Sequence, residues 1–142
     1  MTRRDWGTSF GLLLARVAFG CFMLVHGVPK LTGFGELANK FPDPLGMGSR
    51  LSLMAAIGAE VGCSVLLILG LGTRLAALPL AFTMIVALFL VHGAEGWQKQ
   101  EMAALYLAVY ATLVFTGPGK FSVDHCLWGR KGNASDDVPA KG

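Results

Sequence analysis

A single carboxylate, Glu60, lies near the middle of an otherwise apolar stretch at residues 51–71. At about 1.5 Å per residue, a helix over this stretch is about as long as the hydrocarbon core of a bilayer is thick. A carboxylate at that depth is costly and normally faces the inside of a helix bundle, opposite a basic group or a functional cavity. We therefore expect the surroundings of Glu60 to carry chemistry, either as an ion pair or as a site that binds and releases a proton.

The basic partner expected for Glu60 is Arg16, which lies inside the first apolar stretch. At 100° per residue, Arg16 shares one helical stripe with Gly20, Met23, Gly27 and Lys30. Counted from the expected membrane surface, Arg16 and Glu60 differ in depth by roughly 6 Å, which an extended arginine can bridge. We therefore predict an intramembrane Arg16–Glu60 pair. The alternative is that such a pair only fixes the register of two helices.

A second group of polar residues gathers where three predicted helices reach the opposite membrane surface. Its members are His26, Lys30, His92, Trp97 and Glu101. One interpretation is a pocket for the polar head of a ligand such as a quinone, whose carbonyls accept hydrogen bonds from histidine or lysine. The alternative is interfacial anchoring, because lysine snorkels and tryptophan prefers the headgroup level.

The sequence gives less support to a metal, haem, thiol redox or nucleotide site. Two imidazoles and a carboxylate are suitable metal ligands, but their spacing matches no metal motif, so we predict neither a metal nor a haem site. Cys21, Cys63 and Cys126 form no CxxC pair. We expect them to act as small apolar residues rather than as a redox pair. The glycines are dispersed and form no nucleotide-binding loop.

Four apolar stretches position these residues. Hydrophobic residues make up 54% of the chain and charged ones 15%, against about 25% charged in soluble domains. We expect an all-α polytopic membrane protein, a four-helix antiparallel transmembrane bundle with spans at about 9–29, 51–71, 74–92 and 101–117. A cytoplasmic leader, 1–8, precedes the bundle and a cytoplasmic tail, 118–142, follows it. The loop at 31–48 is long for a helix connection, and we expect its Phe and Leu side chains to dip into the membrane interface.

The distribution of lysine and arginine predicts the orientation. With both termini on one side, that side holds seven basic residues, Arg3, Arg4, Arg74, Lys120, Arg130, Lys131 and Lys141, and the other holds four, Lys30, Lys40, Arg50 and Lys99. This bias favours both termini in the cytoplasm. The net charge of +3 forms no basic stripe, so no nucleic-acid partner is predicted. The lipid bilayer is the expected surrounding, and small residues on the helix faces are compatible with a homodimer.

The order and spacing of several short motifs resemble the DoxX family of small four-helix bacterial membrane proteins. The motifs are Arg16 in the first span, HGVPKL at 26–31, EVGCSVLLILGLGTR at 60–74, HGAEGWQKQE at 92–101 and GPGKFSVD at 117–124. The resemblance covers about residues 12–124. It implies a four-helix bundle in the bacterial inner membrane. The recurring polar and glycine positions of the family fall on Arg16, His26, Gly27, Lys30, Glu60, Arg74, Glu101, Gly117, Pro118, Gly119, Ser122 and Asp124.

Three classes of function stay open. The family takes its name from a subunit of a quinone-linked oxidoreductase, so the resemblance ranks first an accessory or quinone-interacting subunit that works with a separate redox partner. In that case a quinone is the cofactor expected, and the chain is an enzyme only as a subunit. The second class is a structural protein that recruits a partner and has no chemistry of its own. The third is a small transporter that uses the mid-membrane carboxylate.

Overall fold

The computed structural model describes residues 2–129, and between these residues the chain is helical without a strand. The long helices are α1 (Arg3–Thr32), α5 (Thr73–Val86) and α6 (Trp97–Thr116). The shorter ones are α2 (Phe34–Leu37), α3 (Ser49–Ile57), α4 (Ser64–Leu69) and α7 (Val123–Trp128). Two π-helical turns complete the set, η1 (Gly58–Cys63) between α3 and α4 and η2 (Ala87–Val91) at the end of α5. The all-helical prediction is confirmed.

Three continuous helices are long and apolar enough to cross a membrane, namely Arg3–Thr32, Ser49–Leu69 and Thr73–Val91. The second of them consists of α3, η1 and α4, and the third of α5 and η2. Helix α6 has 20 residues but is not among these three, and its first two turns carry Lys99 and Glu101. The chain is therefore a membrane protein with three clear spans, and α6 as the fourth span stays a prediction that its length allows.

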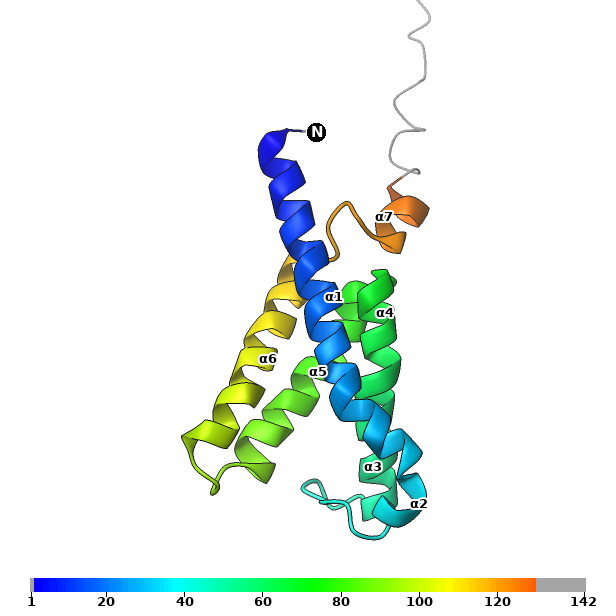
Figure 1. The fold of residues 1–142 in the computed structure, drawn as a ribbon, viewed down its shortest axis with the longest axis vertical. Coiled ribbons are helices and arrows are strands. Elements are labelled where there is room, and N and C mark those ends of the chain that lie inside the picture. The colour runs from blue at the N-terminus through cyan, green and yellow to red at the C-terminus, as the bar shows by residue number, and fades with distance from the viewer. Residues whose placement is uncertain (1, 130–142) are drawn as a thin grey trace, which may run out of the picture.

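Helix α1 begins earlier than the predicted first span because Thr2 caps it. The Thr2 hydroxyl accepts a hydrogen bond from the Asp5 amide, and the Asp5 carboxylate accepts one from the Thr2 amide, both at 3.2 Å. This reciprocal pair is a capping box. The predicted leader, 1–8, is thus largely helical, and Figure 1 shows the first turns of α1 projecting beyond the other helices. Helix α7 lies within the predicted tail, whose remainder, 130–142, falls outside the described residues together with Arg130, Lys131 and Lys141.

Helix α1 packs against α4 and η1, while α5 packs against α6. The predicted stripe of α1 is buried as far as Gly27, with Arg16, Gly20 and Met23 among its buried residues. A Cβ on Gly20 would lie 2.6 Å from Ile68, and one on Gly27 would lie 2.8 Å from Val61. These two glycines therefore allow α1 to approach the second span closely.

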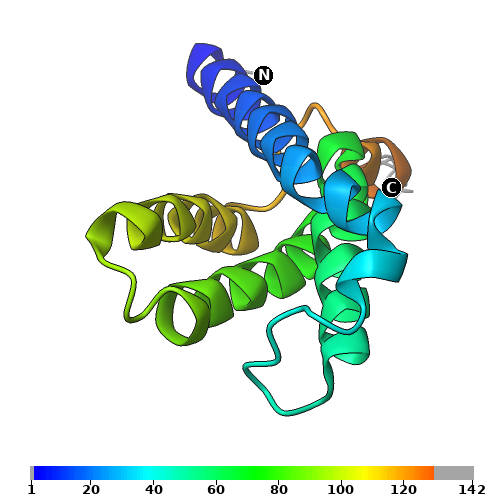
Figure 2. The ribbon, with the colours of Figure 1, turned by 60° about the horizontal axis from the view of Figure 1, so that its bottom comes forward.

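Two ends of the bundle can be distinguished in Figure 1. The start of α1 and all of α7 lie at one end, called the α7 end below. The connections 38–48 and 92–96 lie at the opposite end, called the loop end. Figure 2, turned toward the loop end, shows connection 38–48 extending from α2 out beside α5 before it returns to α3. The polar residues identified in the sequence are divided between these two ends.

Candidate functional site at the loop end

Glu60 forms an ion pair with Lys30. The lysine Nζ lies 2.7 Å from Oε1 and 2.5 Å from Oε2 of the carboxylate. The Glu60 side chain is only 6% exposed, and that of Lys30 is 26% exposed. Lys30 lies in the last turn of α1, and Glu60 lies in η1. The pair therefore joins the first two spans near the loop end, where the carboxylate is buried and its partner is half-buried.

The predicted Arg16–Glu60 pair is wrong. Arg16 is fully buried, and its guanidinium donates to the Leu67 carbonyl at 3.4 Å and to the Phe121 carbonyl. Leu67 lies two helical turns beyond Glu60, about 10 Å along the helix. The prediction counted depth from the expected start of the first span, but α1 begins at Arg3 and crosses the second span so that Arg16 faces α4. Lys30, which lies on the same stripe near the loop end of α1, contacts Glu60 instead.

Both spans that face this ion pair change from α- to π-helical geometry beside it. Glu60 belongs to η1, and the His92 amide donates to the Ala87 carbonyl at 2.8 Å, which closes a wide turn at the end of η2. A single π-helical turn in an α-helix frequently marks a functional site, because it shifts the side chains after it to a new face of the helix. Here the two wide turns aim Glu60 and His92 toward the same space.

A polar recess of about 170 Å³ lies on the α6 side of the ion pair. Four basic side chains line it: His26, Lys30, His92 and Lys99. Its apolar lining includes Met23, Met84, Met102 and Tyr106, and the His26 ring meets the Tyr106 ring edge-on with centroids 5.9 Å apart. The recess therefore brings together residues from α1, η1, α5, α6 and the end of η2.

An apolar cavity of about 550 Å³ lies on the other side of the same ion pair. Its walls come from residues within 41–47 of connection 38–48, from α3 and η1, and from α5 and η2. The lining is mainly aromatic, aliphatic and proline side chains. The polar recess and the apolar cavity share Lys30, Glu60, Ala87 and His92. The ion pair thus lies between a polar and an apolar space.

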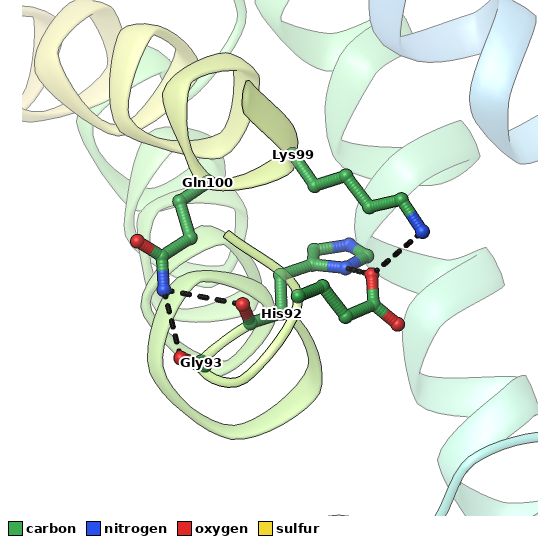
Figure 3. A network of polar contacts seen from close by, with 5 residues as sticks. His92, Gly93, Lys99 and Gln100 are labelled. Atoms are coloured by element: carbon green, nitrogen blue, oxygen red, sulfur yellow. Dashed lines mark hydrogen bonds and ion pairs between the residues drawn. The ribbon is translucent and has the colours of Figure 1, made fainter. Parts of the chain in front are cut away.

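The ring of His92 is held at the mouth of the recess by a small network (Figure 3). Its Nδ1 lies 2.8 Å from Glu95 Oε2, which also lies 3.2 Å from Lys99 Nζ. The Gln100 side chain donates to the carbonyls of His92 and Gly93, at 3.1 and 3.2 Å. The hydrogen bond from His92, followed by that from Lys99, lowers the pKa of Glu95. Glu95 is therefore a carboxylate that holds the His92 ring and the Lys99 ammonium beside each other.

Of the five residues predicted for this site, three come together and two do not. His26, Lys30 and His92 line the polar recess, whereas Trp97 is 65% exposed and Glu101 is also exposed. The recess-facing stripe of α6 is Lys99, Met102, Ala103 and Tyr106. These positions follow the spacing i, i+3, i+4, i+7, and Glu101 lies outside that stripe. The same spacing could have identified Lys99 in the sequence.

Neither a metal group nor a cysteine pair contributes to this region. In the part of the chain that the structure describes, there is no group of three or more His, Cys, Asp or Glu residues that could hold a metal ion. Cys21 and Cys126 are exposed free thiols, and Cys63 is a half-buried one. The Lys, Glu and His side chains that line the recess supply two ammonium groups, one carboxylate and two imidazoles.

The α7 end holds a second polar cluster, called the Arg16 cluster here and made of Arg16, Gly70, Ser122 and Asp124. Asp124 accepts hydrogen bonds from the amides of Gly72 and Thr73 at 2.8 and 3.1 Å, and its own amide donates to the Gly70 carbonyl at 3.0 Å. Gly70 has a φ of +73°, and a Cβ there would collide with the Arg16 guanidinium and with Ser122. Arg16 thus fastens the segment before α7 to the first span, and Asp124 fastens α7 to the turn between the second and third spans.

Comparison with known proteins gives a consistent result. A family model described as DoxX matches residues 11–93. The inner membrane protein YphA of Escherichia coli is 31% identical to this chain, with 80% of this chain and 87% of the relative covered. The "Putative oxidoreductase CatD" of Bacillus subtilis is 30% identical, with 93% and 96% covered. The uncharacterized membrane protein Rv3486 of Mycobacterium tuberculosis is 30% identical, with 82% and 80% covered. No solved structure matches this chain.

Proposed function

This chain belongs to the DoxX family, and we propose that it is a membrane component of an oxidoreductase system that binds a quinone beside the Lys30–Glu60 pair. The quinone ring occupies the space next to the ion pair, and the isoprenoid tail extends into the apolar cavity. The electrons come from a separate redox partner. Two electrons and two protons convert the bound quinone to the quinol, and the chain contributes the binding site rather than the electron source.

The position of the ion pair between two different spaces carries this proposal. A quinone has a polar ring with two carbonyl acceptors and a long apolar tail. The apolar cavity, at about 550 Å³, lies within the usual size of small-molecule sites, about 300–1,000 Å³. An ammonium has three N–H donors, of which Glu60 engages at most two, so Lys30 keeps one for a quinone carbonyl. His92, which lines both spaces, is the second donor within the site.

The comparisons support the redox assignment only through one name. Among the relatives, the Bacillus subtilis protein is named an oxidoreductase, and the others are named as membrane proteins or as uncharacterized. We place the chain in the bacterial inner membrane, as the name of the Escherichia coli relative suggests. The seven-to-four bias of basic residues then puts the α7 end in the cytoplasm and the loop end on the outer side.

The first test is to purify the protein in mild detergent and identify by mass spectrometry the small molecules that accompany it. We expect a quinone with the wild type and a much smaller amount with Glu60→Gln and with His92→Ala. Glu101→Gln is the matched control, because it removes a carboxylate near the site that does not line the recess. Bulk lipid alone in all four preparations contradicts the proposal and directs the search toward a protein partner.

A second candidate function is a proton or cation path, and one observation favours it. The two spaces meet only at residues that include a buried carboxylate and an imidazole, which is the arrangement that carries protons in many membrane proteins. Purified protein in liposomes with a trapped pH indicator distinguishes the two functions. A proton flux that the wild type shows and Glu60→Gln lacks, together with no quinone bound to the wild type, supports the path and contradicts the quinone site.

A further inference from the structure

The outer wall of the apolar cavity is a short connection, called the outer wall segment here and made of residues 41–47. Phe41, Pro42, Pro44, Leu45 and Met47 all line the cavity. This segment follows α2 and leads into α3, and Figure 2 shows that it extends out from the two helices toward α5. A segment in this place decides how much of the cavity is closed, provided that its backbone is held in one conformation.

Asp43 holds this backbone through both of its carboxylate oxygens. Oδ1 accepts hydrogen bonds from the Met47 amide at 2.9 Å and from the Ser52 hydroxyl at 2.8 Å. Oδ2 accepts one from the Gly48 amide at 2.8 Å. Gly48 is the N-cap of α3 and cannot offer a side chain to the free amides there. Asp43 instead binds the amides of Met47 and Gly48, which precede the helix, and the Ser52 hydroxyl in its first turn, close to the end where the helix dipole favours a negative charge.

The segment is also linked to the ion pair at its other end. The Lys30 Nζ lies 5.8 Å from the centre of the Phe41 ring, which is a cation–π distance. Pro42 and Pro44 flank Asp43 and fix their own φ angles, so the backbone on both sides of Asp43 has fewer free torsions. Fastening Asp43 therefore orders the segment as a whole, from the ion pair to the first turn of α3.

We propose that Asp43 is a positioning residue that holds the outer wall segment against the quinone tail and so determines which tails the cavity retains. This inference rests on the proposed quinone site. It separates two parts of the site: the ring is held by Lys30 and His92, and the tail is held by the segment that Asp43 orders. Asp43 itself does not line the cavity, so its effect passes through the residues on either side of it.

The test compares two probes on purified protein in detergent: a benzoquinone ring without a tail and the same ring with a decyl tail. In the wild type we expect the tailed probe to bind more tightly. Asp43→Ala should weaken the tailed probe about tenfold, because the segment must then be ordered at each binding event. The affinity of the tail-less ring should stay the same. Asp43→Asn should recover part of the loss, because its carboxamide oxygen still accepts a hydrogen bond.

Glu36→Ala is the matched control, since it removes another exposed carboxylate, in the preceding helix α2, without touching the cavity lining. If Asp43→Ala leaves the affinity of the tailed probe unchanged, the inference is overturned while the quinone site stands. Equal weakening of both probes also overturns it, because Asp43 would then support the fold in general. If the wild type binds neither probe, the proposed function itself is wrong, and the inference fails with it.

Discussion

Arg16 and Glu60 are both buried charges on helices that face each other, yet their partners are of different kinds. The Arg16 guanidinium donates to two backbone carbonyls, and only its Nε lacks an acceptor among the described residues. Glu60 meets a side-chain ammonium, and both members of that pair line two open spaces. One charge is therefore fixed by the main chain, whereas the other can exchange partners with a ligand.

The kind of partner that a buried charge has indicates its role in a membrane protein. A backbone carbonyl neither titrates nor leaves, so a charge that depends on carbonyls mainly determines how segments pack. Gly70 supports a packing role for the Arg16 cluster, because there is no room for a Cβ at this position. An ion pair of side chains next to a cavity has the opposite properties, because either member can rotate or change its protonation state.

The largest effect expected from this comparison is on stability at the α7 end. Arg16→Ala removes two hydrogen bonds from a charged donor and leaves a cavity, which together should lower the free energy of unfolding by about 3 kcal/mol. Quinone bound per folded molecule should not change. Circular dichroism during thermal unfolding in detergent measures the loss of stability, and mass spectrometry of the folded fraction measures the bound quinone. Arg3→Ala, on the exposed start of the same helix, is the control and should leave both unchanged.

A loss of quinone from folded Arg16→Ala protein would contradict the purely structural role of Arg16, because the α7 end would then take part in binding. Gly70→Ala provides a second check on the same cluster. It places a side chain at a positive φ and against the guanidinium, so it should unfold the protein at least as readily as Arg16→Ala does.

The next largest effect is expected at the loop end, where quinone binding should fall and stability should stay unchanged. The double variant Lys30→Met, Glu60→Met removes both charges and replaces them with apolar side chains of similar length. Replacing a buried ion pair in this way is often neutral for stability, so the melting temperature should stay close to that of the wild type. Quinone retention should fall about tenfold or more, because the ring loses its main donor. Unfolding of the double variant, or full retention of quinone, would show that the ion pair is structural like the Arg16 cluster.

A smaller effect is expected from the rim of the polar recess. Lys99 is exposed and contacts Glu95 at 3.2 Å, and exposed ion pairs contribute little. Lys99→Ala should reduce quinone retention by only about threefold, through looser positioning of His92. Lys120→Ala, at the α7 end, is the lysine control and should have no effect on retention. A larger loss from Lys120→Ala than from Lys99→Ala would reverse the assignment of the two ends.

The comparison also shows which parts of the molecule its sequence predicts. Helical periodicity identified the buried stripe of α1, and the apolar stretches identified the three clear spans. The pairing of Glu60 was missed because depth counted from an assumed membrane surface depends on where each helix begins and how the two helices cross. The π-helical turns were missed as well, since no local residue pattern encodes them.

The five residues of the predicted rim do not all lie together, for a related reason. His26, Lys30 and His92 were expected from their places at helix ends, and the structure brings them together. Trp97 and Glu101 are close to them along the chain, but they lie on other faces of α6. Asp43 was not singled out, because its role arises from a carboxylate that meets the amides of Met47 and Gly48 just before α3, and the sequence pattern does not show that contact.

The smallest effect, and the sharpest test of how the loop end is ordered, is its response to acid. The amide of Gly48, followed by the hydroxyl of Ser52, lowers the pKa of Asp43 below its ordinary value. A carboxyl group whose pKa is lowered in the folded state stabilises that state above its unfolded pKa, and the contribution is lost as the pH falls through the folded pKa. The advantage of the wild type over Asp43→Asn in retaining the tailed quinone should therefore be constant from pH 7 to about 4 and disappear below it. Because the side-chain amide introduced by Asp43→Asn does not titrate, the ratio of the two affinities cancels every other effect of pH that both proteins share. A ratio that stays constant to the lowest pH at which the bundle is folded would mean that the charge of Asp43 does not order the wall.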